Sequence, residues 1–333
     1  MKSFFNAVKI AALYIGAFVG AGFAGGKEIK LYFGSSDVFT IALSSIVSGL
    51  FCFLFLLTGS KGRFPEKIEK VLSYVFALSG VVTSGIMLAG LNELTGSAFS
   101  AIATALLCLV CASFKDGVKN LCVVVVPLMT ATLIFVAKKV DGSIIGSFLP
   151  LNAVAYSAMN MFFEFGLMRE EGRNSTVKED ALAGVLVAAV SFVLIALMRY
   201  TVANAFSSLP FFEAASSVGG GTIASVTLFA AVASTVAGCF SLCEKPLSFL
   251  PRGIRESIVA ITSLCIATCD FEDAVDRVYP VISVAGICLT VAAFLSVVIP
   301  KSKYLIKIKV KRKIGEKKEK NRVLTRKKYN SII

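Results

Sequence analysis

Residues 12–34 read ALYIGAFVGAGFAGGKEIKLYFG, and this stretch decides how the first apolar segment of the chain folds. That segment runs from Phe4 to Phe33, and a straight helix of this length would measure roughly 45 Å against a hydrocarbon core of about 30 Å. Its middle and end are crowded with glycines and charges: Gly16, Gly20, Gly22, Gly25, Gly26, Lys27, Glu28 and Lys30. Either the charged end protrudes, or the helix breaks at the glycines. Unwound backbone at membrane depth is tolerated only where it lines a cavity or binds a ligand.

The composition is that of a membrane protein. Hydrophobic residues make up 56% and charged residues 17% of the 333, and the mean hydropathy is +0.81. The chain has no histidine, so histidine catalysis and histidine metal ligands are absent, and we expect neither an enzyme nor a cofactor. All nine cysteines lie in apolar segments, so we expect no disulfide framework.

The net charge of +13 is concentrated in residues 301–333. They hold fourteen Lys or Arg against Glu316 and Glu319, which leaves the first 300 residues nearly neutral. A basic run directly after a membrane segment is typical of a cytoplasmic tail that faces anionic lipid. We therefore expect anionic lipid, and no nucleic acid, as the partner of this tail.

Ten apolar segments have spanning length or nearly so. They cover about 4–33, 38–59, 69–91, 97–113, 118–138, 148–168, 179–202, 221–243, 254–270 and 279–300. The region 206–221, with Pro210, is long enough for a short surface or re-entrant helix. With the N-terminus inside, the inner loops hold most of the Lys and Arg, and ten spans return the basic tail to the cytoplasm.

Ten spans divide into a first half at about 4–138 and a second at about 148–300. Because five is odd, the second half must be inverted relative to the first. The sixth segment is then the partner of the first. It contains Pro150 and three polar residues that must find partners inside the bundle, Ser157, Asn160 and Glu164. The sequence predicts an all-α membrane protein with ten transmembrane helices in a five-plus-five inverted repeat. Its first and sixth helices are expected to be broken, residues 1–300 form the transporter domain, and 301–333 the tail.

The run from Tyr14 to Ile29 resembles the first-helix motif of the bacterial YkvI-type membrane proteins. Four shorter pieces support the resemblance: Met87-Leu-Ala-Gly, Val125-Val-Pro-Leu-Met, Tyr156-Ser-Ala-Met-Asn and Val278-Tyr-Pro. These proteins look like relatives of the amino acid–polyamine–organocation superfamily, whose fold is the inverted repeat of sodium-coupled amino acid symporters. The resemblance implies a transport role in the bacterial cytoplasmic membrane, and the loop charges place both termini in the cytoplasm.

A cation site is expected between the first and eighth segments. Backbone carbonyls around Gly16 and Val19 end the first half-helix, and Ala231, Ser234 and Thr235 lie on one face of the eighth segment. This spacing is similar to the sodium site of the symporter fold, and the resemblance is what points to Na⁺. Two alternatives stay open: the glycines form a close helix interface, and the hydroxyls bond back to their own helix.

A solute site is expected beside the break. Its residues are Gly20, Ala21, Gly22 and Phe23, whose N–H groups can face an anionic group, and Tyr156, Asn160 and Glu164 of the sixth segment. Glu164 is interpreted as a proton carrier or amine ligand, or else as a side chain that extends toward Arg169. Glu28 is expected to be an ion-pair residue of the outer vestibule rather than a ligand.

These features predict a secondary active transporter of a small organic solute, an amino acid or related compound, coupled to Na⁺ or H⁺ by alternating access. The alternatives are a passive channel or permease, and a membrane scaffold or sensor that acts through its basic tail. Na⁺ as coupling ion is the only bound ion expected, and a homodimer is left open.

Overall fold

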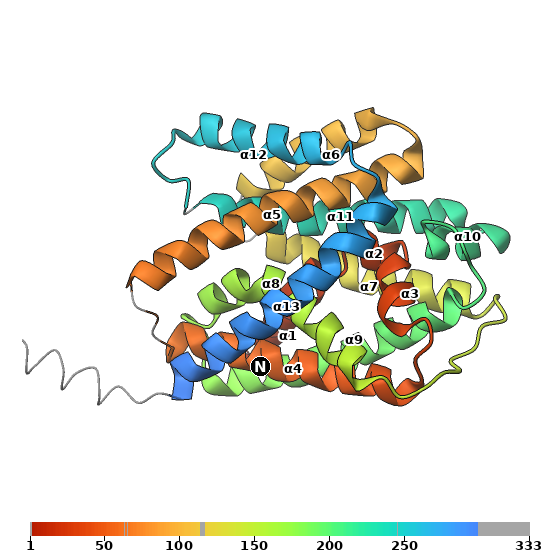
Figure 1. The fold of residues 1–333 in the computed structure, drawn as a ribbon, viewed down its shortest axis with the longest axis horizontal. Coiled ribbons are helices and arrows are strands. Elements are labelled where there is room, and N and C mark those ends of the chain that lie inside the picture. The colour runs from red at the N-terminus through yellow and green to blue at the C-terminus, as the bar shows by residue number, and fades with distance from the viewer. Residues whose placement is uncertain (1, 63, 65, 114–116, 245, 299–333) are drawn as a thin grey trace, which may run out of the picture.

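The computed structural model describes residues 2–62, 64, 66–113, 117–244 and 246–298, so the predicted basic tail at 301–333 lies outside the described residues. Within them the chain is all-helical and has no strand (Figure 1). The helices are α1 (Lys2–Phe18), α2 (Ala21–Ala24), α3 (Lys27–Phe33), α4 (Val38–Ser60), α5 (Glu66–Thr95), α6 (Ala98–Ser113), α7 (Gly117–Ala137), α8 (Pro150–Glu171), α9 (Val177–Thr201), α10 (Pro210–Ser217), α11 (Gly221–Glu244), α12 (Arg252–Ile266) and α13 (Phe271–Val298).

Six of these helices contain a stretch long and apolar enough to cross a membrane. The stretches are Val38–Ser60, Glu66–Thr95, Asn120–Ala137, Val177–Thr201, Gly221–Cys243 and Phe271–Val298. Large apolar side chains such as Phe39, Leu78 and Val124 are exposed on the outside of the bundle, as on a surface that faces lipid tails. The chain is a multi-pass membrane protein. The short helix expected within 206–221 is α10.

The first apolar segment is broken, as predicted, and it is broken twice. α1 ends at Phe18, the single turn α2 follows after Gly20, and α3 starts at Lys27. Gly26 has a φ of 85°, a left-handed conformation that side chains with a Cβ rarely adopt. This turn redirects the chain before α3, so the segment is bent and is not one straight helix.

The sixth apolar segment is not broken, and this expectation was wrong. α8 runs without interruption from Pro150 to Glu171. Pro150 occupies the first turn, where no backbone N–H is needed for the helix, so it starts α8 instead of kinking it. Between residues 150 and 165 there is no glycine that would let the backbone unwind.

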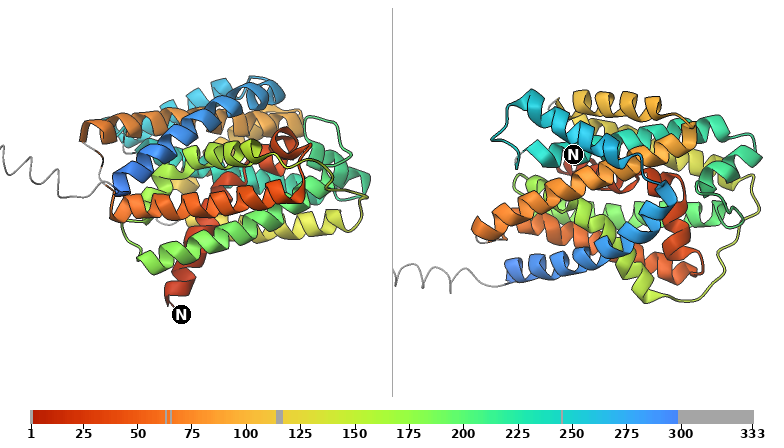
Figure 2. Two further views of the ribbon diagram at one scale, coloured as in Figure 1. Left: turned by 60° about the horizontal axis from the view of Figure 1, so that its bottom comes forward. Right: turned by 45° about the horizontal axis from the view of Figure 1, so that its top comes forward.

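The helices pack in one bundle in which α4 contacts α8 and α9, α13 contacts α8, and α11 contacts α5 (Figure 2). α4 and α9 touch through their backbones: a Cβ added to Gly49 would lie 2.5 Å from the carbonyl oxygen of Gly184. Small residues at such crossings let helices approach closely, and in lipid this packing drives helix association.

Arg199 of α9 fixes the end of the broken segment. Its guanidinium, almost fully buried, donates from Nε to Phe33 O at 2.7 Å and from Nη2 to Gly34 O at 2.8 Å. It also reaches Ser143 O at 3.3 Å and Ile145 O at 3.4 Å in the link between α7 and α8. A cation at the carboxyl end of a helix is stabilised by the free carbonyls there. α3 is thereby held to the link that joins the two predicted halves.

Candidate solute and cation site

The residues predicted to bind a cation meet between the end of α1 and the middle of α11. Ser234 Oγ lies 3.1 Å from Gly16 O and 2.8 Å from Ala231 O, so its proton can be donated to either carbonyl. Thr235 Oγ1 lies 3.1 Å from Ala17 O and 3.5 Å from Gly16 O. Ser234 Oγ is therefore within hydrogen-bond distance both of the α1 carbonyl, as the cation site requires, and of a carbonyl of its own helix, as the alternative interpretation requires.

Five oxygens converge there: three carbonyls, from Gly16, Ala17 and Ala231, and two hydroxyls. They come from the carboxyl end of a half-helix, which carries partial negative charge, and from a neighbouring intact helix. Broken half-helix ends of this kind hold coupling ions in transporters. Ala17 was missed by the sequence reasoning, because the symporter spacing points to Val19. No hydrogen bond joins the Val19 carbonyl to α11 in the described part of the chain, and Val19 as a ligand stays a prediction.

Gly20, in the first break, is covered by two other helices. A Cβ at this position would lie 2.5 Å from the sulfur of Met87 on α5 and 3.3 Å from Thr235 Oγ1 on α11. Ala21 begins the one-turn helix α2, and Phe23 is fully buried with its ring centroid 5.2 Å from that of Phe18. The break is thus in direct contact with the cation residues on one side and with aromatic rings on the other.

Glu28 is buried, and the expectation that it forms an ion pair in an outer vestibule was wrong. Its side chain is 2% exposed and lies over Gly22, where an added Cβ would clash with Glu28 Oε1. Its Oε2 has no hydrogen-bond partner among the described residues. The left-handed turn at Gly26 explains the difference, because it rotates α3 so that Lys27 reaches outward and Glu28 points back to the break.

Three tyrosines surround this carboxyl group. Glu28 faces Tyr32 of α3, Tyr156 of α8 and Tyr279 of α13. The hydroxyl of Tyr32 is paired with Ser283 Oγ at 2.8 Å, whereas that of Tyr279 interacts with the Glu28 carboxyl group and that of Tyr156 with the Asn160 side chain. A buried carboxyl group beside tyrosine hydroxyls forms a polar cluster in an apolar interior, which is the kind of place where a polar ligand can be held.

The remaining polar residues predicted on α8 lie further along the same helix. Asn160 Nδ2 donates to the carbonyl of Tyr156 at 3.0 Å. Glu164 is fully buried, and neither of its carboxyl oxygens has a hydrogen-bond partner among the described residues. It does not extend toward Arg169, because that guanidinium pairs with Glu69 of α5 at 3.0 Å. The alternative of an interface ion pair for Glu164 is therefore wrong.

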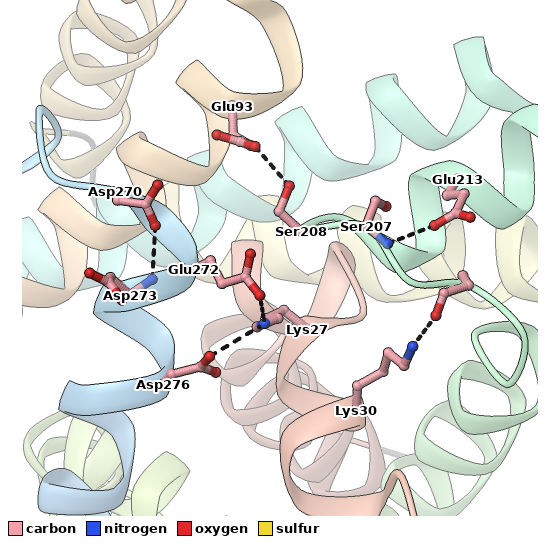
Figure 3. A network of polar contacts seen from close by, with 11 residues as sticks. Lys27, Lys30, Glu93, Ser207, Ser208, Glu213, Asp270, Glu272, Asp273 and Asp276 are labelled. Atoms are coloured by element: carbon pink, nitrogen blue, oxygen red, sulfur yellow. Dashed lines mark hydrogen bonds and ion pairs between the residues drawn. The ribbon is translucent and has the colours of Figure 1, made fainter.

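A polar network covers one end of this site (Figure 3). Lys27 of α3 pairs with Glu272 and Asp276 at the start of α13, and Lys30 donates to the carbonyl of Ala205. The loop that follows α9 is held in turn, since Glu213 Oε2 accepts from the backbone N–H groups of residues 206 and 207 at 2.8 Å each. These contacts tie α3 to α13 and to the loop before α10.

The fold is similar to that of a known transporter. Two variant forms of the manganese transporter of Eremococcus coleocola superpose with a TM-score of 0.56, at 14% and 13% sequence identity. The match covers 88% of this chain and 79% and 78% of theirs. The same transporter in complex with an aromatic bis-isothiourea substituted compound gives a TM-score of 0.52 at 14% identity, over 88% of this chain and 78% of that one. No family model and no curated protein matches the chain. At this identity the likeness shows a membrane transporter fold.

Proposed function

We propose that the protein is a secondary active transporter of a small organic solute, an amino acid or related compound, coupled to Na⁺ or H⁺ by alternating access. The proposal includes the YkvI-type relationship and the wider superfamily suggested by the first-helix motif. It also places the protein in the bacterial cytoplasmic membrane with both termini inside.

One observation carries the proposal. The first helix breaks between Phe18 and Ala21, and the carbonyls that end its first half meet the Ser234 and Thr235 hydroxyls of an intact helix. A plain structural helix gains nothing from such a break, because the backbone groups it frees are costly in a membrane. A break that presents oxygens to a coupling ion explains why the interruption exists.

The packing of the helices supports the five-plus-five inverted repeat. If α1–α3 and α4 to α7 correspond in order to α8, α9, α11, α12 and α13, each main contact has a counterpart. α4 packs on α8 as α9 packs on α1, α1 packs on α7 as α8 packs on α13, and α5 packs on α12 as α11 packs on α6. The pairs α4–α9 and α5–α11 map onto themselves. A repeat related by a pseudo-two-fold axis produces this correspondence.

The surroundings of Glu28 favour a solute with an ammonium group. The carboxyl group is buried beside the break and lies near Tyr32, Tyr156 and Tyr279. A carboxylate compensates the charge of an ammonium group, and aromatic faces attract it as well. The N–H groups of Ala21 to Phe23 remain the predicted partners of a solute carboxylate.

Access to this site requires movement. The rings of Tyr156 and Phe23 are almost fully buried, and the contacts of Lys27 and Lys30 hold α3 over the site on the side predicted to be outside. Release of α3 from α13 would open that side. Alternating access then consists of loosening these contacts while those at the other end of the bundle tighten.

A divalent metal is the second candidate for the transported substrate, and the similarity to a manganese transporter is what favours it. The described residues contain no cluster of three or more His, Cys, Asp or Glu side chains that could hold a metal ion. The two hydroxyls and three carbonyls of the α1–α11 site are uncharged, so they suit a singly charged alkali ion better than Mn²⁺, whose double charge carboxylate ligands compensate. Organic solute is therefore the first candidate.

Uptake by proteoliposomes tests the proposal. The purified full chain is offered a panel of labelled amino acids and amines, and Mn²⁺ separately, with and without inward Na⁺ and proton gradients. We expect at least one organic solute to accumulate above its external concentration, and only with a gradient. Accumulation of Mn²⁺ alone would establish the second candidate, and equilibration without dependence on gradients would establish a passive permease.

Deletion of residues 304–333 separates transport from a scaffold or sensor role. A transporter whose site lies in the bundle should keep most of its uptake without the basic tail. Loss of all function on deletion, with the shortened chain still inserted in the membrane, would favour a protein that acts through its tail.

A further inference from the structure

Glu164 is a buried carboxyl group without a compensating partner. It lies on α8 at 0% exposure, and both of its oxygens lack a hydrogen-bond donor among the described residues. The cost of placing a lone ionised carboxylate in the middle of a membrane helix is roughly 2.5–3.5 kcal/mol even on the mildest scales. An ionisable side chain buried in a membrane helix in this way is a candidate functional group.

Five titratable groups lie close enough to Glu164 to interact with it electrostatically, and they come from four neighbouring helices and from α8 itself. They are Tyr14 of α1, Cys52 of α4, Cys122 of α7, Cys239 of α11 and Tyr156 of α8. All five are weak acids that are uncharged at neutral pH, and a neutral ring of this kind cannot balance a negative charge.

The charged groups of the other helices that pack on α8 are occupied elsewhere. Glu69 of α5 pairs with Arg169, and Glu28 of α3 interacts with Tyr156 and with Tyr279 of α13. Three carbonyls and two hydroxyls converge at the α1–α11 site, whereas Glu164 has no comparable set of oxygens within hydrogen-bond distance. A proton, which needs no coordination shell, is the cation that fits this position.

We propose that Glu164 is a protonation site that takes up and releases one proton in each transport cycle, separate from the cation site between α1 and α11. In the conformation seen here the carboxyl group holds the proton, which came from water on one face of the membrane. When the bundle opens to the other face, water reaches Glu164 and the proton leaves to it, so one proton crosses per cycle. This inference rests on the proposed transport function.

α1 links the two sites. Tyr14 faces Glu164, and two residues later the Gly16 carbonyl accepts from Ser234. A movement of this half-helix therefore changes the surroundings of both sites together. Coupling of proton binding to the binding of a second ion or of the solute needs such a shared element. Two sites affect each other only if the ligands of both favour the same conformation of the protein.

Infrared spectroscopy of the purified full chain in lipid tests the protonation directly, without any solute. We expect a carbonyl stretching band of a protonated carboxylic acid at neutral pH in the unchanged protein. The band should be reduced in Glu164→Gln by the contribution of one carboxyl group, since the buried Glu28 is still present; it should be shifted in Glu164→Asp and unchanged in Glu66→Gln, whose side chain is exposed in the first turn of α5. Gel filtration and circular dichroism show whether each variant is folded. A folded Glu164→Gln protein that retains the whole band would overturn the proposal.

A pH-sensitive dye inside proteoliposomes tests proton movement. Transport of a solute from the uptake panel should acidify the lumen, and the Glu164→Gln variant should lose this acidification. If the unchanged protein accumulates solute without moving protons, the proton cycle is wrong while the transport function stands. If it moves no solute at all, the transport function fails, and the infrared result still decides whether Glu164 binds a proton.

Discussion

Replacement of Thr235 by valine removes one oxygen from the α1–α11 cation site and leaves the β-branched shape in place. Shape matters at this position because a Cβ on the neighbouring Gly20 would lie only 3.3 Å from Thr235 Oγ1. The hydroxyl oxygen is 3.1 Å from Ala17 O and 3.5 Å from Gly16 O, so it is one of five oxygens that can share a bound Na⁺.

The expected loss follows from the strength of one contact to a charged group. Such contacts contribute about 1.5–3 kcal/mol each. Since about 1.4 kcal/mol corresponds to a tenfold change in affinity, the Na⁺ concentration for half-saturation should rise by about 10- to 150-fold. The free energy of unfolding should change little, because the buried valine replaces the threonine methyl group and leaves the backbone of α11 intact.

Binding of radioactive sodium to the purified protein measures this change without knowledge of the solute. Thr235→Ser, which keeps the hydroxyl, should bind Na⁺ nearly as the unchanged protein does. Ser225→Ala is the matched control on the same helix, since its hydroxyl donates to Gly221 O at 3.0 Å, four residues earlier, and to no other group among the described residues. If Thr235→Val binds Na⁺ with unchanged affinity, or if the unchanged protein binds none, the five-oxygen site is refuted.

Three further predictions concern the break and the network over it. Gly20→Leu should abolish uptake without preventing membrane insertion, because a Cβ at this position would lie 2.5 Å from a methionine sulfur of α5. Gly253→Leu is the control, since the space around Gly253 is open, and it should leave uptake unchanged. Uptake by Gly20→Leu at the normal rate would disprove the role of the break. Lys27→Ala should speed solute exchange, by at most about fivefold, since partly exposed ion pairs contribute about 0–1 kcal/mol. Arg277→Ala removes an exposed ion pair within α13 and should leave the exchange rate unchanged. Equal exchange rates in the two variants would exclude Lys27 from gating. The backbone N–H groups of residues 207 and 206 hold the pKa of Glu213 below its ordinary value, so its stabilisation of the loop is present at neutral pH and is lost as the pH falls through that lowered pKa. Amide exchange at 206–207 should therefore be faster in Glu213→Gln than in the unchanged protein at neutral pH, and equal in the two proteins in strong acid. Equal exchange at neutral pH would contradict this.

Much of the helical pattern could be predicted, because hydropathy and glycine position act locally. The break after Phe18 followed from a segment too long and too rich in glycine for one straight span. The contact of Ser234 with Gly16 followed from the spacing of small polar residues together with the family resemblance. The opposite error was made for α8, where Pro150 was interpreted as an interruption although proline in the first turn favours helix initiation.

The environments of the carboxyl groups could not be predicted in the same way, because they depend on tertiary packing. Glu28 stands between two lysines in the sequence, which favours an exposed position, yet the turn at Gly26 rotates it inward onto Gly22. One signal was available: Glu28 follows the pair Gly25-Gly26, and glycines can turn the backbone so that the next residues point in a new direction. For Glu164 the nearest basic residue along α8, Arg169, was already engaged by Glu69 on a different helix.

The central claim is that the broken first helix binds an ion whose movement drives the movement of a solute. Its most direct test is the flux of radioactive sodium into proteoliposomes, measured with and without a solute that the uptake panel has identified. The account predicts sodium entry that requires the solute, saturates with it, and disappears in Thr235→Val at a sodium concentration near the half-saturation of the unchanged protein. Sodium entry that is the same with and without solute, or solute accumulation that no sodium accompanies, would contradict it.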